Sequence, residues 1–232
     1  MDTNSNQARR VVIGITAHVD AGKTTLAEAM LYRTGRLRKL GRVDHGSAAM
    51  DSHLLERERG ITIFSSQAEL PIGNLEVTLL DTPGHVDFSA EMERTLSVLD
   101  YAILVISGVD GVQAHTRTLW RLLELYRIPT FLFVTKMDFG RCGRGQMMEH
   151  LRHELGEGCV DFTPADRERR MEQLATCRED ALEVYLDGGE VPDVLVRQLV
   201  GRRLVFPCWF GSGLKLEGID EFLEGLARYV EP

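Results

Sequence analysis

Short apolar segments alternate with stretches of helical spacing from Val11 to the end of the chain, and this alternation constrains the fold more than any other feature. The apolar segments are rich in β-branched and aromatic residues, whereas the stretches between them repeat apolar residues every three or four positions. Such alternation builds a mostly parallel sheet covered by helices on both faces, which is an α/β fold of three layers. We predict strands at 11–16, 76–81, 101–107, 130–135 and 204–210, and helices at 24–32, 89–99, 113–126 and 219–229.

Two stretches interrupt this alternation. Residues 35–60 are polar and lack periodicity, which predicts a functional loop. Residues 142–203 are charged and mostly helical with no obvious strand, so we expect a mainly helical insertion at the edge of the sheet, before the last strand. Residues 63–70 are expected to pair with the strand at 76–81 as an antiparallel hairpin across a turn at 71–74.

Composition and charge narrow the classes of function. No apolar run is long enough to cross a bilayer, and the polar residues 1–10 predict a flexible N-terminus, so we expect no membrane contact and a cytoplasmic location. Residues 11–232 are then expected to form one domain. The net charge of −8 argues against sequence-independent binding of nucleic acid over the whole surface. We also expect no sequence-specific DNA binding. The basic stretch 33–42 could make a local contact with nucleic acid, but we interpret it as a solvated loop.

The cysteines and two helical histidines give no metal signature. The four cysteines are widely spaced and include no Cys-x-x-Cys pair, which is typical of reduced thiols rather than a zinc site or a disulfide framework. His150 and His153 have a spacing that occurs in metal sites, but no further cysteine or carboxylate pattern completes one. We therefore expect both histidines on a solvated helical face.

A glycine-containing turn, Ala17-His18-Val19-Asp20-Ala21-Gly22-Lys23-Thr24, joins the first predicted strand to the first helix. Backbone N–H groups of such a turn, together with the helix N-terminus, can wrap a phosphate chain. Lys23 is expected to reach the β- and γ-phosphates, and the Thr24 hydroxyl to bind Mg²⁺. The usual pattern begins with Gly where this chain has Ala17. We predict a phosphate-binding loop that extends to Thr25, on a three-layer α/β/α sandwich of the P-loop NTPase type.

A second motif, Asp81-Thr82-Pro83-Gly84-His85, follows the strand at 76–81. An Asp at a strand end can hold Mg²⁺ through water, and the Gly84 amide can contact the γ-phosphate. In a parallel sheet the carboxyl ends of the strands share one edge, where ligands bind. Asp81 is therefore expected close to the phosphate-binding loop.

Two further motifs predict that the base is guanine. In Thr135-Lys136-Met137-Asp138, the Asp138 carboxylate can accept both N1–H and N2–H of guanine, which adenine does not offer in that arrangement. The commoner form of this motif begins with Asn, so Thr135 lacks the amide that usually ties the base loop to the phosphate loop. Gly211-Ser212-Gly213-Leu214, after the last strand, can donate a backbone N–H to guanine O6.

Together with Arg59-Gly60-Ile61-Thr62-Ile63 and Asp81-Thr-Pro-Gly-His85-Val-Asp-Phe88, these motifs resemble the translational GTPases, specifically the elongation factor G group. Within that group the chain is most similar to the ribosomal-protection tetracycline-resistance proteins. Its insertion is shorter than that of elongation factor G, and the segment 204–220 follows the resistance-protein pattern. The resemblance runs from about Val11 to Tyr229.

The resemblance implies further roles. It implies that Thr62 completes Mg²⁺ coordination when GTP is bound and that His85 positions the attacking water. Val19 and Ile61 would flank the path of that histidine, and Asp20 would help to organise charge around the phosphates. It also implies GTP and GDP with Mg²⁺ as cofactors, and GTP hydrolysis that is slow without the ribosome. The chain would be a monomeric GTPase fragment of a longer protein whose partner is the ribosome.

Three alternatives remain open at the level of sequence. The first is an elongation factor G-like ribosomal GTPase without a role in drug resistance. The second is a non-hydrolysing module that senses guanine nucleotides, against which Lys23, Thr62 and His85 together argue. The third is an ATP-dependent P-loop enzyme, which Asp138 and the 211–214 motif disfavour.

Overall fold

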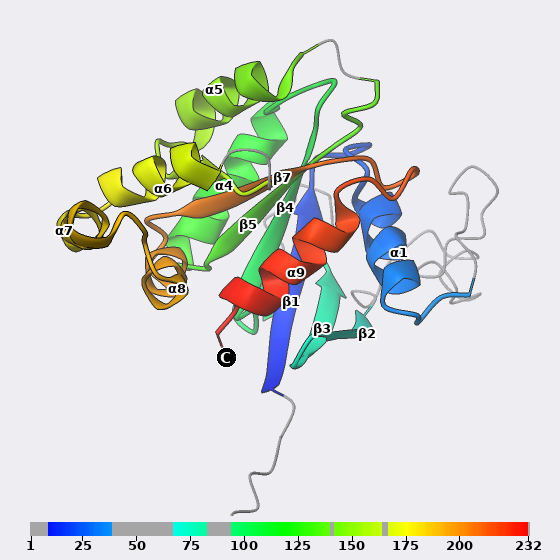
Figure 1. The fold of residues 1–232 in the computed structure, drawn as a ribbon. Helices are drawn as coiled ribbons and strands as arrows, with labels where there is room; N and C mark the ends of the chain where they lie inside the picture. The colour runs from blue at the N-terminus through cyan, green and yellow to red at the C-terminus, as the bar shows by residue number, and fades with distance from the viewer. Residues whose placement is uncertain (1–8, 39–66, 83–93, 140–141, 164–166, 232) are drawn as a thin grey trace, which may run out of the picture.

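The computed structural model describes residues 9–38, 67–82, 94–139, 142–163 and 167–231, and Figure 1 shows them as a central sheet with helices on both sides. Within these ranges the seven strands lie in the order β2-β3-β1-β4-β5-β7-β6. Every neighbouring pair is parallel except β2 with β3, which confirms the predicted α/β sandwich. The strands are β1 (Arg9–Ala17), β2 (Gln67–Ile72), β3 (Leu75–Asp81), β4 (Tyr101–Ser107), β5 (Thr130–Thr135), β6 (Cys159–Asp161) and β7 (Phe206–Phe210). The helices are α1 (Lys23–Arg33), α4 (Ala114–Leu125), α5 (Arg144–Leu155), α6 (Arg167–Thr176), α7 (Glu179–Gly188), α8 (Asp193–Gly201) and α9 (Ile219–Tyr229).

The sheet separates two cores, because successive side chains of a strand point to opposite faces. In β4, Ile103 and Val105 belong to the core that contains residues of α1 and α9, whereas Leu104 and Ile106 belong to the core that contains residues of α4 and α5. Every residue of β4 and β5 is buried. Burial on both faces explains why these strands are continuously apolar in the sequence.

Trp209 of β7 anchors α9 to the sheet. Its ring lies 5.3 Å from that of Phe222 and 5.4 Å from that of Phe162, between centroids. A Cβ atom at Gly225 would lie 2.1 Å from the Trp209 ring, so a glycine is needed for α9 to approach this closely. The close packing of α9 on β7 also fixes the loop between them, which carries the last of the predicted nucleotide motifs.

The segment before the last strand differs from the sequence prediction in one respect. Helices α5 to α8 occupy most of it, but β6 lies within it and pairs in parallel with β7 at the edge of the sheet. The expectation that this segment lacks a strand is therefore wrong. Three residues are too few for a period of two to be recognised in the sequence.

The predicted hairpin is formed by β2 and β3, with a shorter turn than expected. The strands continue through the pairs Pro71–Glu76 and Ile72–Leu75, so only Gly73 and Asn74 remain in the turn. Pro71 is tolerated because β2 is an edge strand, which does not need every N–H for pairing. Residues 63–66 of the predicted strand and 89–93 of the predicted helix lie outside the described residues, and 94–96 are helical.

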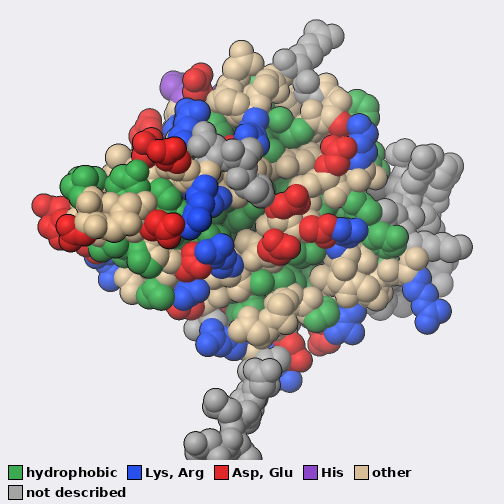
Figure 2. Space-filling view, viewed as in Figure 1, with side chains coloured by type: hydrophobic (Ala, Val, Ile, Leu, Met, Phe, Trp, Pro, Cys, Tyr) green, Lys and Arg blue, Asp and Glu red, His purple; other side chains and the backbone are tan. Residues whose placement is uncertain are grey.

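The face of the molecule that carries α9 is strongly charged, and Figure 2 shows acidic and basic side chains intermingled over it. A cavity of about 630 Å³ opens here between α6, α9 and the connection from α7 to α8. Two ion pairs join charged residues at its rim, Arg167 with Glu190 (2.7 Å) and Arg228 with Asp193 (2.5 Å). Those predicted nucleotide-binding residues that the structure describes do not line this cavity.

Candidate functional site

The predicted phosphate-binding loop lies between β1 and α1, as the sequence predicts. Gly22 adopts a left-handed conformation (φ 94°) that a side chain would strain, and it turns the chain into the helix. The Gly22 carbonyl then accepts the first helical hydrogen bond from Leu26 (2.9 Å). The N–H groups in the first turn of a helix have no acceptor within the helix, so this turn presents donors to an anion.

Lys23 joins the phosphate-binding loop to the end of β3. Its ammonium donates a hydrogen bond to the Thr82 carbonyl (2.8 Å) and forms an ion pair with Asp81. Thr82 is held in turn by β1, because its hydroxyl donates to the Ile15 carbonyl (2.9 Å). Lys23 and Asp81 therefore meet at the carboxyl edge of the sheet, as the order of the motifs predicts. Thr24 lies beside Lys23 in the first turn of α1, so a hydroxyl and a carboxylate, oxygen donors that Mg²⁺ prefers, lie at this edge.

Two hydrogen bonds join the predicted base-recognition segment, residues 135–138, to the predicted phosphate-binding loop. The Thr135 hydroxyl lies 2.5 Å from the Ala21 carbonyl and 3.2 Å from that of Ile106. The Lys136 ammonium donates to the Asp20 carbonyl (2.7 Å). Thr135 lacks the usual amide, as the sequence indicates, but its hydroxyl supplies a link between the two loops. Asp20 and Lys136 both have positive φ angles (60° and 56°), a strain that clusters at binding sites.

The Asp138 carboxylate is buried beside this link. Its side chain is 5% exposed, and one oxygen lies 3.3 Å from the Lys215 ammonium. The other oxygen, Oδ1, is buried and has no hydrogen-bond partner within the part of the chain that the structure describes. A buried charged oxygen without a donor is costly, so this oxygen marks a position where an incoming N–H would be stabilised.

The loop from Gly211 to Leu214 contacts the segment that carries Asp138. The Gly211 carbonyl accepts the Met137 N–H (3.2 Å), which joins the two base motifs. Ser212 exchanges two backbone hydrogen bonds with Glu217, so its own N–H is occupied. No acceptor for the Gly213 N–H is found among the described residues. A Cβ at Gly213 would lie 3.0 Å from the Thr25 side chain, so this glycine lets the loop rest on α1.

Some predicted residues cannot be placed. Thr62, Gly84, His85 and Ile61 lie outside the described residues, so their roles stay predictions. Val19 is exposed, and His18 packs edge-on against His115 of α4, with ring centroids 5.7 Å apart. Arg33, the first residue of the basic stretch, pairs with Asp220 of α9 and is therefore held against the domain.

Sequence reasoning missed two contributors to the site. Lys215 forms an ion pair with one oxygen of Asp138, and no local pattern pairs these two residues. The loop after β4 also supports the base segment, because the Gly108 N–H donates to the Thr135 carbonyl (2.8 Å). Both contacts join residues distant in the chain, so only the folded arrangement reveals them.

The link made by the Thr135 hydroxyl gives a first test. Replacing Thr135 by Val keeps the shape of the side chain but leaves the buried Ala21 carbonyl without this donor, so we expect about fivefold weaker GDP binding. Thr135→Ser should bind GDP as the unchanged chain does. The matched control is Thr130→Val, which removes another buried hydroxyl of β5 at the opposite end of the strand. Equal GDP dissociation constants for Thr135→Val and Thr130→Val would contradict the assignment.

Comparisons with known proteins agree with this geometry. Residues 8–232 match the family described as the elongation factor Tu GTP binding domain. The chain is 41% identical to the oxytetracycline resistance protein of Streptomyces rimosus and 37% identical to the tetracycline resistance protein TetP of Clostridium perfringens. Each match covers 94% of this chain and 37% of the relative, so the chain spans little more than a third of the length of these proteins.

The fold has a solved counterpart as well. A crystal structure of a protein from Thermus thermophilus superposes with a TM-score of 0.82 at 28% sequence identity. It covers 97% of this chain, while this chain covers 40% of it. In the described part of the chain no helix is long and apolar enough to cross a membrane.

Proposed function

Because the chain belongs to the elongation factor Tu-type GTP-binding family, the GTPase domains of translation factors, we propose that it binds GTP and GDP with Mg²⁺ at the carboxyl edge of its sheet. The observation that carries the base assignment is the buried, unpartnered oxygen of Asp138. Guanine offers two adjacent N–H donors to a carboxylate, and a site with such an unpaired acceptor discriminates strongly against a base that lacks them. The Gly213 N–H lies in the neighbouring loop, where it can donate to guanine O6.

The phosphates would lie over the start of α1. The N–H groups of the Gly22–Thr24 turn and the Lys23 ammonium would stabilise their charge. Thr24 and Asp81 would hold Mg²⁺, and these residues fit the ion because Asp81 already holds a cation, the Lys23 ammonium, at its carboxylate. When bound, Mg²⁺ supplies positive charge to the phosphate oxygens. Lys23 would then exchange its contact with Asp81 for the β- and γ-phosphates.

Hydrolysis would proceed by attack of water on the γ-phosphorus, in line with the bond to the leaving oxygen of GDP. In this proposal His85 orients the water and Thr62 completes the metal coordination when GTP is bound, as in the family that the motifs resemble. Val19 and Ile61 would restrict the path of His85, and Asp20 would balance charge at the phosphates. Without a partner that positions His85, hydrolysis should be slow.

We propose further that the full-length protein acts on the ribosome in the cytoplasm and protects it from tetracycline. The relatives from Streptomyces rimosus and Clostridium perfringens, which are named for resistance to oxytetracycline and tetracycline, support this. The test is to express the full-length gene in a tetracycline-sensitive host and to measure the drug concentration that stops growth. A rise is expected; no rise would favour a translational GTPase with another role.

The role of His85 is tested by GTP hydrolysis in the presence of ribosomes. With His85→Ala the hydrolysis rate should fall by about a hundredfold, because a positioned acid–base or water-orienting group contributes on the order of 10²–10⁴ in rate. GDP affinity should be unchanged, because the histidine is not assigned to ground-state binding. Hydrolysis at the unchanged rate would remove His85 from the mechanism.

A further inference from the structure

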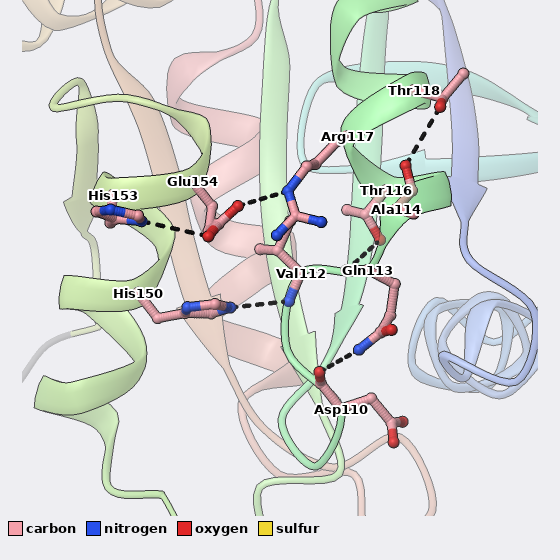
Figure 3. Close-up of polar contacts among 10 residues, drawn as sticks. All are labelled: Asp110, Val112, Gln113, Ala114, Thr116, Arg117, Thr118, His150, His153 and Glu154. Atoms are coloured by element: carbon pink, nitrogen blue, oxygen red, sulfur yellow. Dashed lines mark hydrogen bonds and ion pairs between the residues drawn. The ribbon is translucent and has the colours of Figure 1, made fainter.

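His150 is partly buried and contacts the loop that follows β4. The Val112 N–H donates a hydrogen bond to its Nε2 atom (3.1 Å), as Figure 3 shows. A Cβ at Gly111 would lie 2.9 Å from the same nitrogen, so the ring rests directly on the loop backbone. Of the two histidines predicted on a solvated helical face, the His153 side chain is 82% exposed, whereas His150 is only partly exposed and its ring also contacts this loop.

A second contact fastens the same two elements. Glu154, one helical turn after His150, accepts a hydrogen bond from Arg117 of α4 (2.6 Å; Figure 3). This bond lowers the pKa of Glu154 and raises the pKa of Arg117, so both groups stay charged around neutral pH. His150 therefore contacts the loop before α4, and Glu154 contacts α4 itself. The Glu154 contact does not depend on His150.

The loop held by His150 is also the loop that supports the base segment. Its Gly111 N–H donates to the Ser107 carbonyl (2.8 Å), which closes the turn. At its other side the Gly108 N–H donates to the Thr135 carbonyl (2.8 Å). A Cβ at Gly108 would lie 2.8 Å from the Met137 sulfur, so the turn packs closely against the residue before Asp138.

We propose that His150 is a positioning residue for the guanine site: its imidazole Nε2 atom, which accepts the Val112 N–H, holds the 108–112 turn against the Thr135–Asp138 segment, and guanine-nucleotide affinity falls when this acceptor is lost. The proposal rests on the proposed function, because it assigns His150 to the same base site. His150 acts through the loop backbone and is not itself assigned a contact with the nucleotide.

The test measures the dissociation constant of the 232-residue chain for a fluorescent GDP analogue. His150→Leu removes the acceptor of the Val112 N–H and should weaken binding about fivefold, the effect of one lost hydrogen bond. His150→Gln restores an acceptor and should bind the analogue as tightly as the unchanged chain.

His153→Gln is the matched control, since it removes an exposed histidine of the same helix and should bind the analogue as the unchanged chain does. If His150→Leu binds GDP as tightly as the unchanged chain, or if His150→Gln binds as weakly as His150→Leu, the proposal is wrong. If the unchanged chain does not bind GDP, the proposed function itself fails and the proposal fails with it.

Discussion

Replacing Asp138 by Asn is expected to weaken GDP binding by about a thousandfold and to create binding of xanthosine diphosphate. Two hydrogen bonds to a charged carboxylate contribute about 2 kcal/mol each, and about 4 kcal/mol corresponds to that factor. An asparagine amide would keep one acceptor but turn an N–H₂ group toward the guanine N2 amine. Xanthine carries an oxygen at that position, so the same amide would donate to it. The gain of a new ligand separates a change of base recognition from simple loss of the fold.

The measurement is a titration of the Asp138→Asn chain with GDP and with xanthosine diphosphate. Binding is monitored by the fluorescence of a bound analogue. Asp187→Asn serves as the control because Asp187 is exposed on α7, away from the site, and it should leave both dissociation constants unchanged. Tight GDP binding by Asp138→Asn would show that the buried Asp138 oxygen does not face the base. Recognition of guanine by this carboxylate would then be excluded.

Replacing Lys23 by Met is expected to weaken GTP binding by about a hundredfold or more. Removing one member of a partly buried charge pair costs about 2–5 kcal/mol, and the methionine side chain keeps the length but not the charge. The substitution also leaves Asp81 without its cation in the nucleotide-free protein. Part of the loss should therefore be recovered at high Mg²⁺ concentration, because the metal can neutralise the same carboxylate.

GTP dissociation constants at low and high Mg²⁺ concentration measure both effects. Arg10→Met removes an exposed basic side chain that pairs with Glu76 on the surface, and it should change neither constant. An undiminished GTP affinity in Lys23→Met would place the phosphates elsewhere on the domain.

The arrangement of the sheet and the place of the site were predictable because both depend on local patterns. The apolar runs of β4 and β5 are continuous because both faces are covered, and each nucleotide motif directly follows a strand. Parallel strands bring those strand ends to one edge, so the order of the motifs is enough to predict that Lys23 and Asp81 meet.

The remaining features depend on contacts between distant segments. The three residues of β6 become a strand only because β7 offers an edge for pairing. The pairing of Lys215 with Asp138 and the hydrogen bond from Val112 to His150 likewise join segments that share no sequence pattern. The Thr135 hydroxyl donates to the Ala21 carbonyl across 114 positions of the sequence, and neither residue alone indicates this contact.

The most direct measurement of the central claim is a competition titration. A fluorescent GDP analogue bound to the 232-residue chain is displaced with GDP, GTP and ATP, first in Mg²⁺ and then in EDTA. We predict displacement by GDP and GTP but not by ATP, with weaker binding of the guanine nucleotides after EDTA. Equal displacement by ATP would contradict recognition of guanine by Asp138 and, with it, the assignment of this edge of the sheet as a GTP site.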